Sequence, residues 1–298
     1  MSPPVSLRSV AAATLGFSVL AGGCVVQVES RNYAAREEKR FTVQDAPEVT
    51  LSTFDGSIEV RAWDRDEVLV EIEKTGASRE HVEGIAVVGE QEGNRVRVEA
   101  RQPASGWELV GAERSARLVA TLPERCNLLA RTSDGSVQAE RLTGRVELRS
   151  GDGGIRALDL SGDLVVDTGD GSVKVHGVRG TLDARTHDGS ITAVGQLSTA
   201  RLESGDGTVS LTVEPGSVMS QAWEVATGDG SIAIYLPEAF DGELDARTRD
   251  GALRFDRGMT EAPIEQDGSA RAVRATFGRG GHVITLRARD GSISVRRR

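Results

Sequence analysis

The sequence predicts an all-β protein, a parallel β-solenoid with coils of about 18 to 23 residues. Three observations predict this fold. Asp-Gly pairs recur at a fixed interval, apolar residues alternate with polar ones on both sides of these pairs, and aromatic residues make up only 4% of a chain that has 35 Gly. A fixed period of this size is typical of stacked repeats. Alternation at period two indicates strands rather than helices.

The first predicted segment is a signal peptide over residues 1–24. Arg8 precedes an apolar run from Val10 to Leu20, which is about as long as a signal-peptide core and too short to span a bilayer as a mature helix. The run ends in Leu-Ala-Gly-Gly-Cys24, which resembles a bacterial lipoprotein processing site. Leu20 stands four residues before the cysteine, one more than usual. We expect lipidation of Cys24, with simple secretion or a retained membrane anchor as the alternatives.

Residues 25–40 are rich in charged side chains and are predicted to form a polar tether. Val25 follows Cys24, so the Asp that holds lipoproteins at the inner membrane of some bacteria is missing. We therefore expect an exported envelope protein that a lipid anchors in the outer membrane. Cys126 is the other cysteine, and we expect it to be a small buried filler.

The repeat domain is predicted over residues 41–298 and is most regular over 118–213. Its structural corners are Asp-Gly pairs at Asp55, Asp134, Asp152, Asp170, Asp188, Asp206, Asp229, Asp250 and Asp290, and the spacing is constant from Asp134 to Asp206. Glycine at a corner supplies φ > 0, and the aspartate before it can accept backbone N–H groups. The Ser or Thr two residues before most of these aspartates is expected to bond to the neighbouring coil. A second corner is expected near Gly144, Gly162 or Gly180.

An antiparallel alternative also fits, because Asp-Gly between alternating apolar residues is the strongest short hairpin signal. The constant unit length favours the solenoid, in which equivalent residues stack about 4.8 Å apart. Outside the regular part, the long interval from Asp55 to Asp134 predicts about four coils, and the interval from Asp250 to Asp290 predicts two. Candidate strands before Asp134 are 68–72, 85–88, 95–100 and 117–121.

A family resemblance rests on Leu122-Pro123, on Leu128 to Gly144 with its Thr-Ser-Asp-Gly-Ser-Val corner, and on Ser150-Gly-Asp-Gly153. These motifs resemble the bacterial "putative adhesin" domains of unknown function, which are related to auto-transporter adhesin head domains. The resemblance covers residues 41–298. It implies a single-stranded, right-handed β-helix at the cell surface, and it brings no catalytic residues.

The stacked aspartates are the first candidates for chemistry. Carboxylates about 5 Å apart disfavour full ionisation, and a bound Ca²⁺ would compensate them. The Gly-Gly-x-Gly-x-Asp nonapeptide of calcium-binding β-rolls is absent from the sequence. We therefore interpret the aspartates as structural corners and predict neither a metal site nor a cofactor.

Other chemistry has less support. His81, His176, His187 and His282 lack metal-ligand spacing, and no nucleophile motif occurs, so no catalytic residue is predicted. Exposed aromatics could bind sugar. The tryptophans are Trp63, Trp107 in a Gly/Pro/Ser loop, and Trp223 at an inward position.

The predicted function is that of a non-enzymatic, lipid-anchored envelope protein whose β-solenoid surface serves adhesion, scaffolding or contact with an unknown protein or glycan partner. The alternative is a carbohydrate-binding or carbohydrate-active β-helix. A net charge of −9 argues against a nucleic-acid partner, because binding to phosphate needs a basic footprint.

Overall fold

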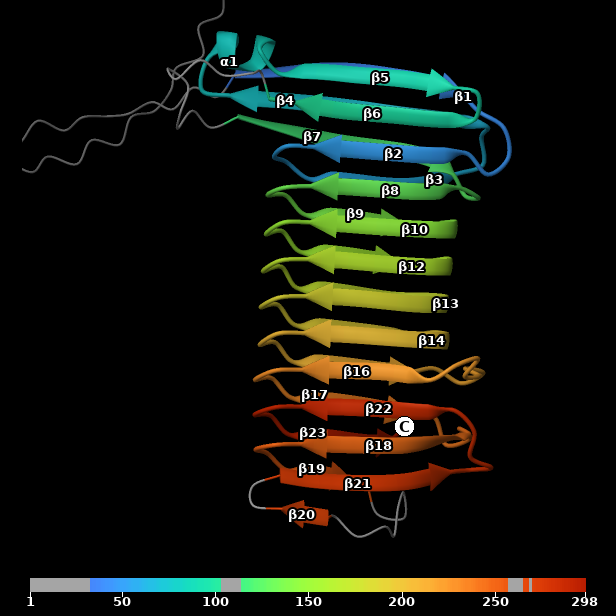
Figure 1. Ribbon diagram of the computed structural model, residues 1–298. Coiled ribbons are helices and arrows are strands. Elements are labelled where there is room, and N and C mark those ends of the chain that lie inside the picture. The colour runs from blue at the N-terminus through green and yellow to red at the C-terminus, as the bar shows by residue number, and fades with distance from the viewer. Residues whose placement is uncertain (1–32, 103–113, 257–264, 268–269) are drawn as a thin grey trace, which may run out of the picture. The chain divides into compact units, whose positions relative to one another are not determined.

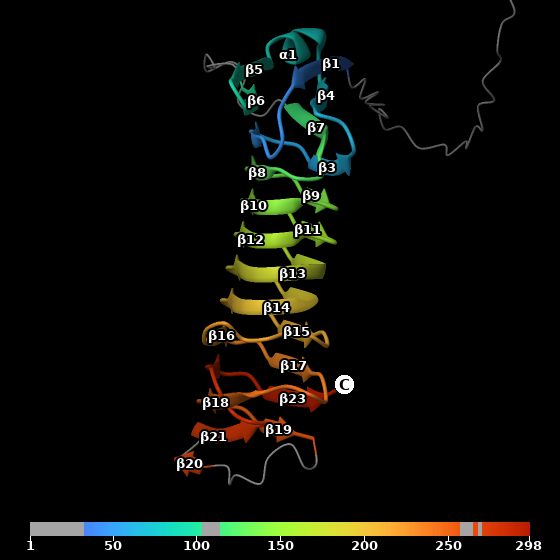
Figure 2. The same cartoon turned by 90° about the vertical axis from the view of Figure 1, so that its right-hand side faces the viewer.

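The computed structural model describes residues 33–102, 114–256, 265–267 and 270–298. In these ranges every regular element except the short helix α1 (Arg79–Glu83) is a strand, which confirms the all-β class. The unit Asn32–Arg298 is a tall stack in which two ladders of strands run along opposite sides (Figures 1 and 2). We call them ladder A and ladder B.

Ladder A contains, in spatial order, β5 (Ala86–Glu92), β6 (Arg95–Arg101), β2 (Glu48–Thr53), β8 (Asn127–Thr132), β10 (Thr143–Ser150), β12 (Ser161–Thr168), the second halves of β13 (Val173–Thr186) and β14 (Ile191–Ser204), β16 (Trp223–Thr227), β22 (Val283–Ala288), β18 (Gly242–Thr248), β21 (Ala270–Phe277) and β20 (Glu265–Asp267).

Ladder B contains β1 (Tyr33–Thr42), β4 (Glu67–Gly76), β7 (Arg114–Pro123), β3 (Ile58–Trp63), β9 (Val137–Glu140), β11 (Ile155–Leu158), the first halves of β13 and β14, β15 (Val209–Val213), β17 (Ile232–Leu236), β23 (Ile293–Arg297) and β19 (Leu253–Phe255).

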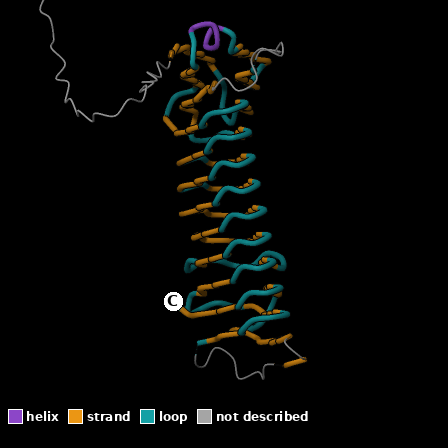
Figure 3. Tube along the Cα trace, turned by 90° about the vertical axis from the view of Figure 1, so that its left-hand side faces the viewer, coloured by secondary structure: helices purple, strands orange, loops and turns teal. Residues whose placement is uncertain are grey.

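Neighbouring strands in the middle of both ladders pair in parallel, and their register equals the sequence period. Val146 of β10 faces Leu164 of β12, which in turn faces Leu182 of β13, so each partner lies one full repeat further along the chain. The hairpin alternative is not realised between these strands. The chain passes from one ladder to the other at each corner, and Figure 3 shows the successive turns one above the next.

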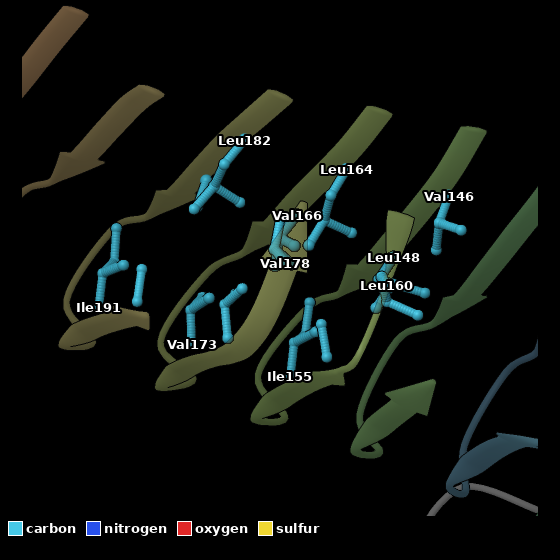
Figure 4. Close-up of a cluster of buried hydrophobic side chains, with 14 of the residues drawn as sticks. Val146, Leu148, Ile155, Leu160, Leu164, Val166, Val173, Val178, Leu182 and Ile191 are labelled. Atoms are coloured by element: carbon cyan, nitrogen blue, oxygen red, sulfur yellow. The ribbon is translucent and has the colours of Figure 1, made fainter. Parts of the chain in front are cut away.

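The core lies between the two ladders. Alternate residues of each strand point inward, and the same position in successive coils forms a column of Val, Leu, Ile or Ala. Figure 4 shows Val146, Leu164 and Leu182 in one such column and Ile155, Val173 and Ile191 in another. All six are buried. Because a coil buries its apolar side chains against its two neighbours, no single coil has a core of its own.

The two ends of the stack do not follow the order of the chain. At the N-terminal end, β2 and β3 lie between the level of β6 and β7 and the level of β8 and β9. At the C-terminal end, β22 and β23 lie between the level of β16 and β17 and the level of β18 and β19. In both places a segment distant in sequence completes the stack.

The predicted tether over 25–40 is wrong from Tyr33 onward, because residues 33–42 form strand β1. β1 pairs antiparallel with β4, so the folded domain begins well before residue 41. The tether was predicted because this segment is rich in charged side chains, but an edge strand can have the same composition. An edge strand rich in charged side chains resists pairing with other chains, and Arg36, Glu38 and Arg40 are all exposed on β1.

The predicted numbers of coils at the two ends are also wrong. Between Asp55 and Asp134 the four candidate strands exist as β4, β5, β6 and β7, but β4 and β5 pair antiparallel with β7 and β6 and add no coils. After β19, strand β21 pairs antiparallel with β18 instead of forming a coil. These antiparallel strands cover the ends of the parallel ladders.

Candidate functional site on the corners and outer faces

The Asp-Gly corners form a single column along one edge of the stack. The backbone N of Asp152 donates to the carbonyl oxygen of Ser133 in the preceding coil (3.1 Å), and Asp206 N donates in the same way to His187 O (3.2 Å). A Cβ at Gly171 would lie under 3.0 Å from the carbonyl oxygen of Gly153. The same close approach repeats at the other corner glycines. Glycine is required there because one backbone packs directly on the next.

The predicted reason for these glycines is therefore only partly correct. Within the described ranges, Gly56 is the only glycine of the nine corners with φ in the left-handed region, at 120°. At the second corner the prediction is confirmed, because φ is 141° at Gly144, 114° at Gly162 and 132° at Gly180. The two corners thus use glycine for different reasons, close packing at one and backbone angle at the other.

A ladder of buried hydroxyl groups lies behind the Asp-Gly corners. The Thr186 hydroxyl donates to Gly171 O of the preceding coil (2.9 Å) and accepts from Gly189 N of its own coil (3.1 Å). Ser204 makes the same two bonds, to Gly189 O (2.8 Å) and from Gly207 N (2.9 Å). The predicted bond between neighbouring coils therefore exists, but the hydroxyl donates to the neighbouring coil and accepts an N–H only within its own coil.

The Asp290 coil is an exception, because Ala288 occupies the hydroxyl position. The buried residues of this column in the other coils are Thr53, Thr132, Ser150, Thr168, Thr186, Ser204, Thr227 and Thr248.

The carboxylates of the corners face outward. Asp134, Asp152, Asp170, Asp188 and Asp206 are all exposed. Among the contacts of the described residues, none of these five carboxylates accepts a backbone hydrogen bond, so the Asx-turn prediction is wrong for them. The corner is already closed by backbone contacts and by the buried hydroxyl.

Near the C-terminal end of the column, two of the corner aspartates form ion pairs with arginines. Asp290 pairs with Arg249 (3.1 Å) and Asp229 with Arg289 (3.6 Å). At the N-terminal end, burial, followed by the charge of Asp134, raises the pKa of the Asp55 carboxyl. Within the described residues no group of three or more His, Cys, Asp or Glu has the geometry of a metal site.

The remaining predicted positions are the tryptophans and the cysteines, which differ in burial. Trp223 is buried as predicted, and its indole N–H donates to Ser198 O (3.1 Å). Cys126 is a buried free thiol, also as predicted, and burial raises its pKa to about 12. Trp63 is half-buried, with Arg65 over its ring at 5.0 Å. Cys24 and Trp107 lie outside the described residues.

Ion pairs join neighbouring strands on the outer faces of both ladders, as Arg61 of β3 and Glu140 of β9 do on ladder B (3.8 Å). On ladder A, opposite charges pair between neighbouring coils, as in Arg185 with Glu203 (3.9 Å) and Arg201 with Glu224 (3.8 Å). On ladder B, Arg156 faces Lys174 across the β11–β13 pair. Beside them the surface is hollowed over about 310 Å³ between Ser136 and Ser172.

This depression was not predicted from the sequence. A signal for it existed, because the corner at Asp152 is followed by Gly153-Gly154, where the neighbouring corners have Gly-Ser.

The described molecule is thus an all-β protein of stacked coils whose most regular residues serve the stack itself. The chain belongs to the Toastrack family DUF4097, whose model matches residues 47–296. No curated protein matches it. Among the described residues no helix has the length and apolar character needed to cross a bilayer.

Solved structures give weak matches. One is a "putative cell adhesion protein" from Clostridium sporogenes, 14% identical, with 89% of this chain and 100% of that chain covered and a TM-score of 0.29. A "putative adhesin" from Bacteroides fragilis is 10% identical, with 89% and 97% covered and a TM-score of 0.43. A "putative lipid binding protein" from Parabacteroides distasonis is 12% identical, with 88% and 96% covered and a TM-score of 0.38.

Proposed function

We propose that this protein is a non-enzymatic lipoprotein of the cell envelope, anchored by lipid at Cys24, whose stacked coils form a right-handed parallel β-solenoid for adhesion, scaffolding or contact with a protein or glycan. The observation that carries the proposal is how the repeated residues are used. Corner glycines and buried hydroxyls bind coil to coil, and the corner aspartates face solvent without a metal-type cluster in the described ranges. A stack of this kind presents long, rigid outer faces, as repeat proteins do for binding.

The anchoring part of the proposal rests on the sequence around Cys24 and is tested separately. Cells that express the wild type or Cys24→Ser are fed a fatty-acid analogue, and the protein is isolated. We expect label on the wild type only and the wild type in the outer-membrane fraction. Equal labelling of both proteins, or of neither, would contradict the proposed anchor.

The non-enzymatic part is tested against the alternative of a carbohydrate-active or carbohydrate-binding β-helix. The purified protein is applied to a glycan array and incubated with the same glycans in an assay for released reducing sugar. Release of reducing ends would contradict the proposal. Binding without release is the expected result if the contact partner is a glycan. The depression on ladder B is the observation that favours testing glycans first.

A further inference from the structure

The regular surface of ladder B is interrupted on its outer side at the corner of the Asp152 coil. Position two after the corner aspartate carries an exposed hydroxyl at Ser136 and Ser172, but Gly154 lies between them. The missing side chain opens the depression of about 310 Å³, which is lined by Ser136, Gln138, Gly154, Arg156, Ser172 and Lys174. This volume is at the small end of the range for ligand pockets, about 300–1,000 Å³. The strands that carry it, β9, β11 and β13, lie side by side in Figure 2.

The fold does not require glycine at position 154. Its φ is outside the left-handed region, and a Cβ there would meet only Ser172 O, at 3.3 Å. The adjacent Gly153 is different, because a Cβ there would lie under 3.0 Å from Gly135 O. A serine at 154 would therefore fit the stack with a small shift, and the depression exists because this coil lacks one.

Two cations border the depression without a carboxylate to neutralise them. Arg156 and Lys174 face each other on neighbouring strands, an arrangement that costs stability because the charges are alike. Both are exposed, and within the described part of the chain neither makes an ion pair, whereas Arg61 of β3 on the same ladder pairs with Glu140 of β9 (3.8 Å). Glu140 on the adjacent strand β9 is a carboxylate on the same ladder, but its ion pairs are with Arg61 (3.8 Å) and Arg141 (3.4 Å).

The surroundings add hydroxyl and amide groups rather than apolar ones. Gln138, Ser136 and Ser172 line the depression, and the same surface continues over Thr192 and Ser210. In the described ranges the large exposed apolar side chains are Tyr33 and Val218, and neither lies on these strands. A ligand that fits has a carboxylate for the cations and several hydroxyls for the polar side chains. The depression offers no apolar pocket for a hydrophobic side chain of a bound peptide.

We propose that this depression binds a uronic-acid residue of an acidic polysaccharide, with its carboxylate between Arg156 and Lys174 and its hydroxyls on Ser136, Gln138 and Ser172. The inference rests on the proposed function, since it names the partner of the contact surface. Arginine suits the role because its planar guanidinium forms paired hydrogen bonds with a carboxylate. Thr192 and Ser210 extend the hydroxyl-rich surface for the next sugar in the chain.

The test uses the full chain with Cys24→Ser, so that binding does not depend on the anchor. Oligogalacturonate is titrated by calorimetry, with a neutral cello-oligosaccharide of the same length and inorganic sulfate as separate arms. Arg156→Glu with Lys174→Glu is expected to weaken oligogalacturonate binding at least tenfold, because two charge-assisted contacts are lost. Gly154→Ser is expected to weaken it several-fold with an unchanged melting temperature.

The matched control is Arg131→Glu with Arg145→Glu, which makes the same change in net charge on the exposed face of ladder A. It is expected to leave binding unchanged. The proposal is overturned if the control weakens binding as much as the test pair, if the neutral oligosaccharide binds equally well, or if sulfate alone accounts for all binding. It is also overturned if oligogalacturonate does not bind. In any of these cases fatty-acid labelling of Cys24 still stands as its own result, so the two proposals fail separately.

Discussion

The coils from Asn127 to Val213 and the two ends of the stack share Asp-Gly corners but differ in how they follow the chain. In the middle, each coil lies on the one before it in sequence, at a register of one repeat period. At the ends, a segment far away in sequence is inserted, β2–β3 at one end and β22–β23 at the other. The repeat period therefore identifies the coils, while the pairing of edge strands decides the order in which they stack.

The largest expected effect follows from removing an inserted end. Deletion of residues 283–298 removes β22 and β23, the parallel partners of both β16–β17 and β18–β19. Native-state hydrogen exchange should show loss of protection over β18, β19 and β21, while β8, β10 and β12 remain protected.

The control for this truncation removes one whole central coil. Deletion of residues 152–169 joins Gly151 to Asp170 and keeps the period intact. Because contacts are made only between neighbouring coils, this variant should fold with protection at both ends. If the central deletion disrupts the C-terminal strands as much as the truncation does, the distinction between middle and ends is wrong.

The next effect concerns close packing at one corner. Gly171→Ala places a Cβ under 3.0 Å from Gly153 O, so the two coils must separate. We expect a loss of about 3 kcal/mol or more in the free energy of unfolding, as for other steric clashes in a packed interior. Gly154→Ala, with 3.3 Å of room, should change it by less than about 1 kcal/mol. Urea denaturation of both variants measures the difference, and equal losses would contradict the packing argument.

A smaller effect is expected from the hydroxyl ladder. Thr186→Val keeps the shape of the side chain but leaves Gly171 O and Gly189 N without this partner. The expected loss is about 1–3 kcal/mol, the cost of unsatisfied buried polar groups. Thr181→Val, whose hydroxyl bonds Asp163 at the exposed surface, is the control and should change stability by about 0.5 kcal/mol or less. A result in which the exposed threonine matters more would refute the ladder as a stabilising feature.

The smallest expected effect is a gain. Ala288 occupies the position at which the other coils have Ser or Thr. The corner of this coil packs on the corner that contains Gly230. Ala288→Ser supplies a hydroxyl that can donate to Gly230 O and accept from Gly291 N. We expect stabilisation of about 0.5–1.5 kcal/mol, the net value of a typical hydrogen bond. Thermal unfolding measures it, and destabilisation would show that this inserted coil packs differently from the central ones.

Much of the middle of the stack could be predicted from the sequence, because its signals are local. Alternation around Asp170 predicts two strands, and the constant spacing predicts their parallel register. The order of the ends could not be predicted, since nothing near Asp55 or Asp290 specifies which distant segment lies beside it. The charged run of β1 was ambiguous, because a tether and a protected edge strand have the same composition.

The candidate site was hidden for a related reason. The Asp-Gly motif identifies the corners, whose residues allow one backbone to pack closely on the next. The depression arises instead from the missing side chain at Gly154. Arg156 and Lys174 are one repeat period apart in sequence and become neighbours only once the register is known. A deviation from the repeat was a better guide to the site than the repeat itself.

One distance comparison tests the stacking order most directly. Spin labels are placed on the outer face of ladder A at position 131 and at either 287 or 247, in a chain whose two cysteines are replaced, and distances are measured by pulsed electron paramagnetic resonance. Arg131 is six pairing steps from Arg287 and seven from Arg247, so at about 4.8 Å per strand we predict about 29 Å and about 34 Å between backbones. A shorter distance to position 247 than to 287 would mean that the coils stack in the order of the chain and would contradict the interleaved ends.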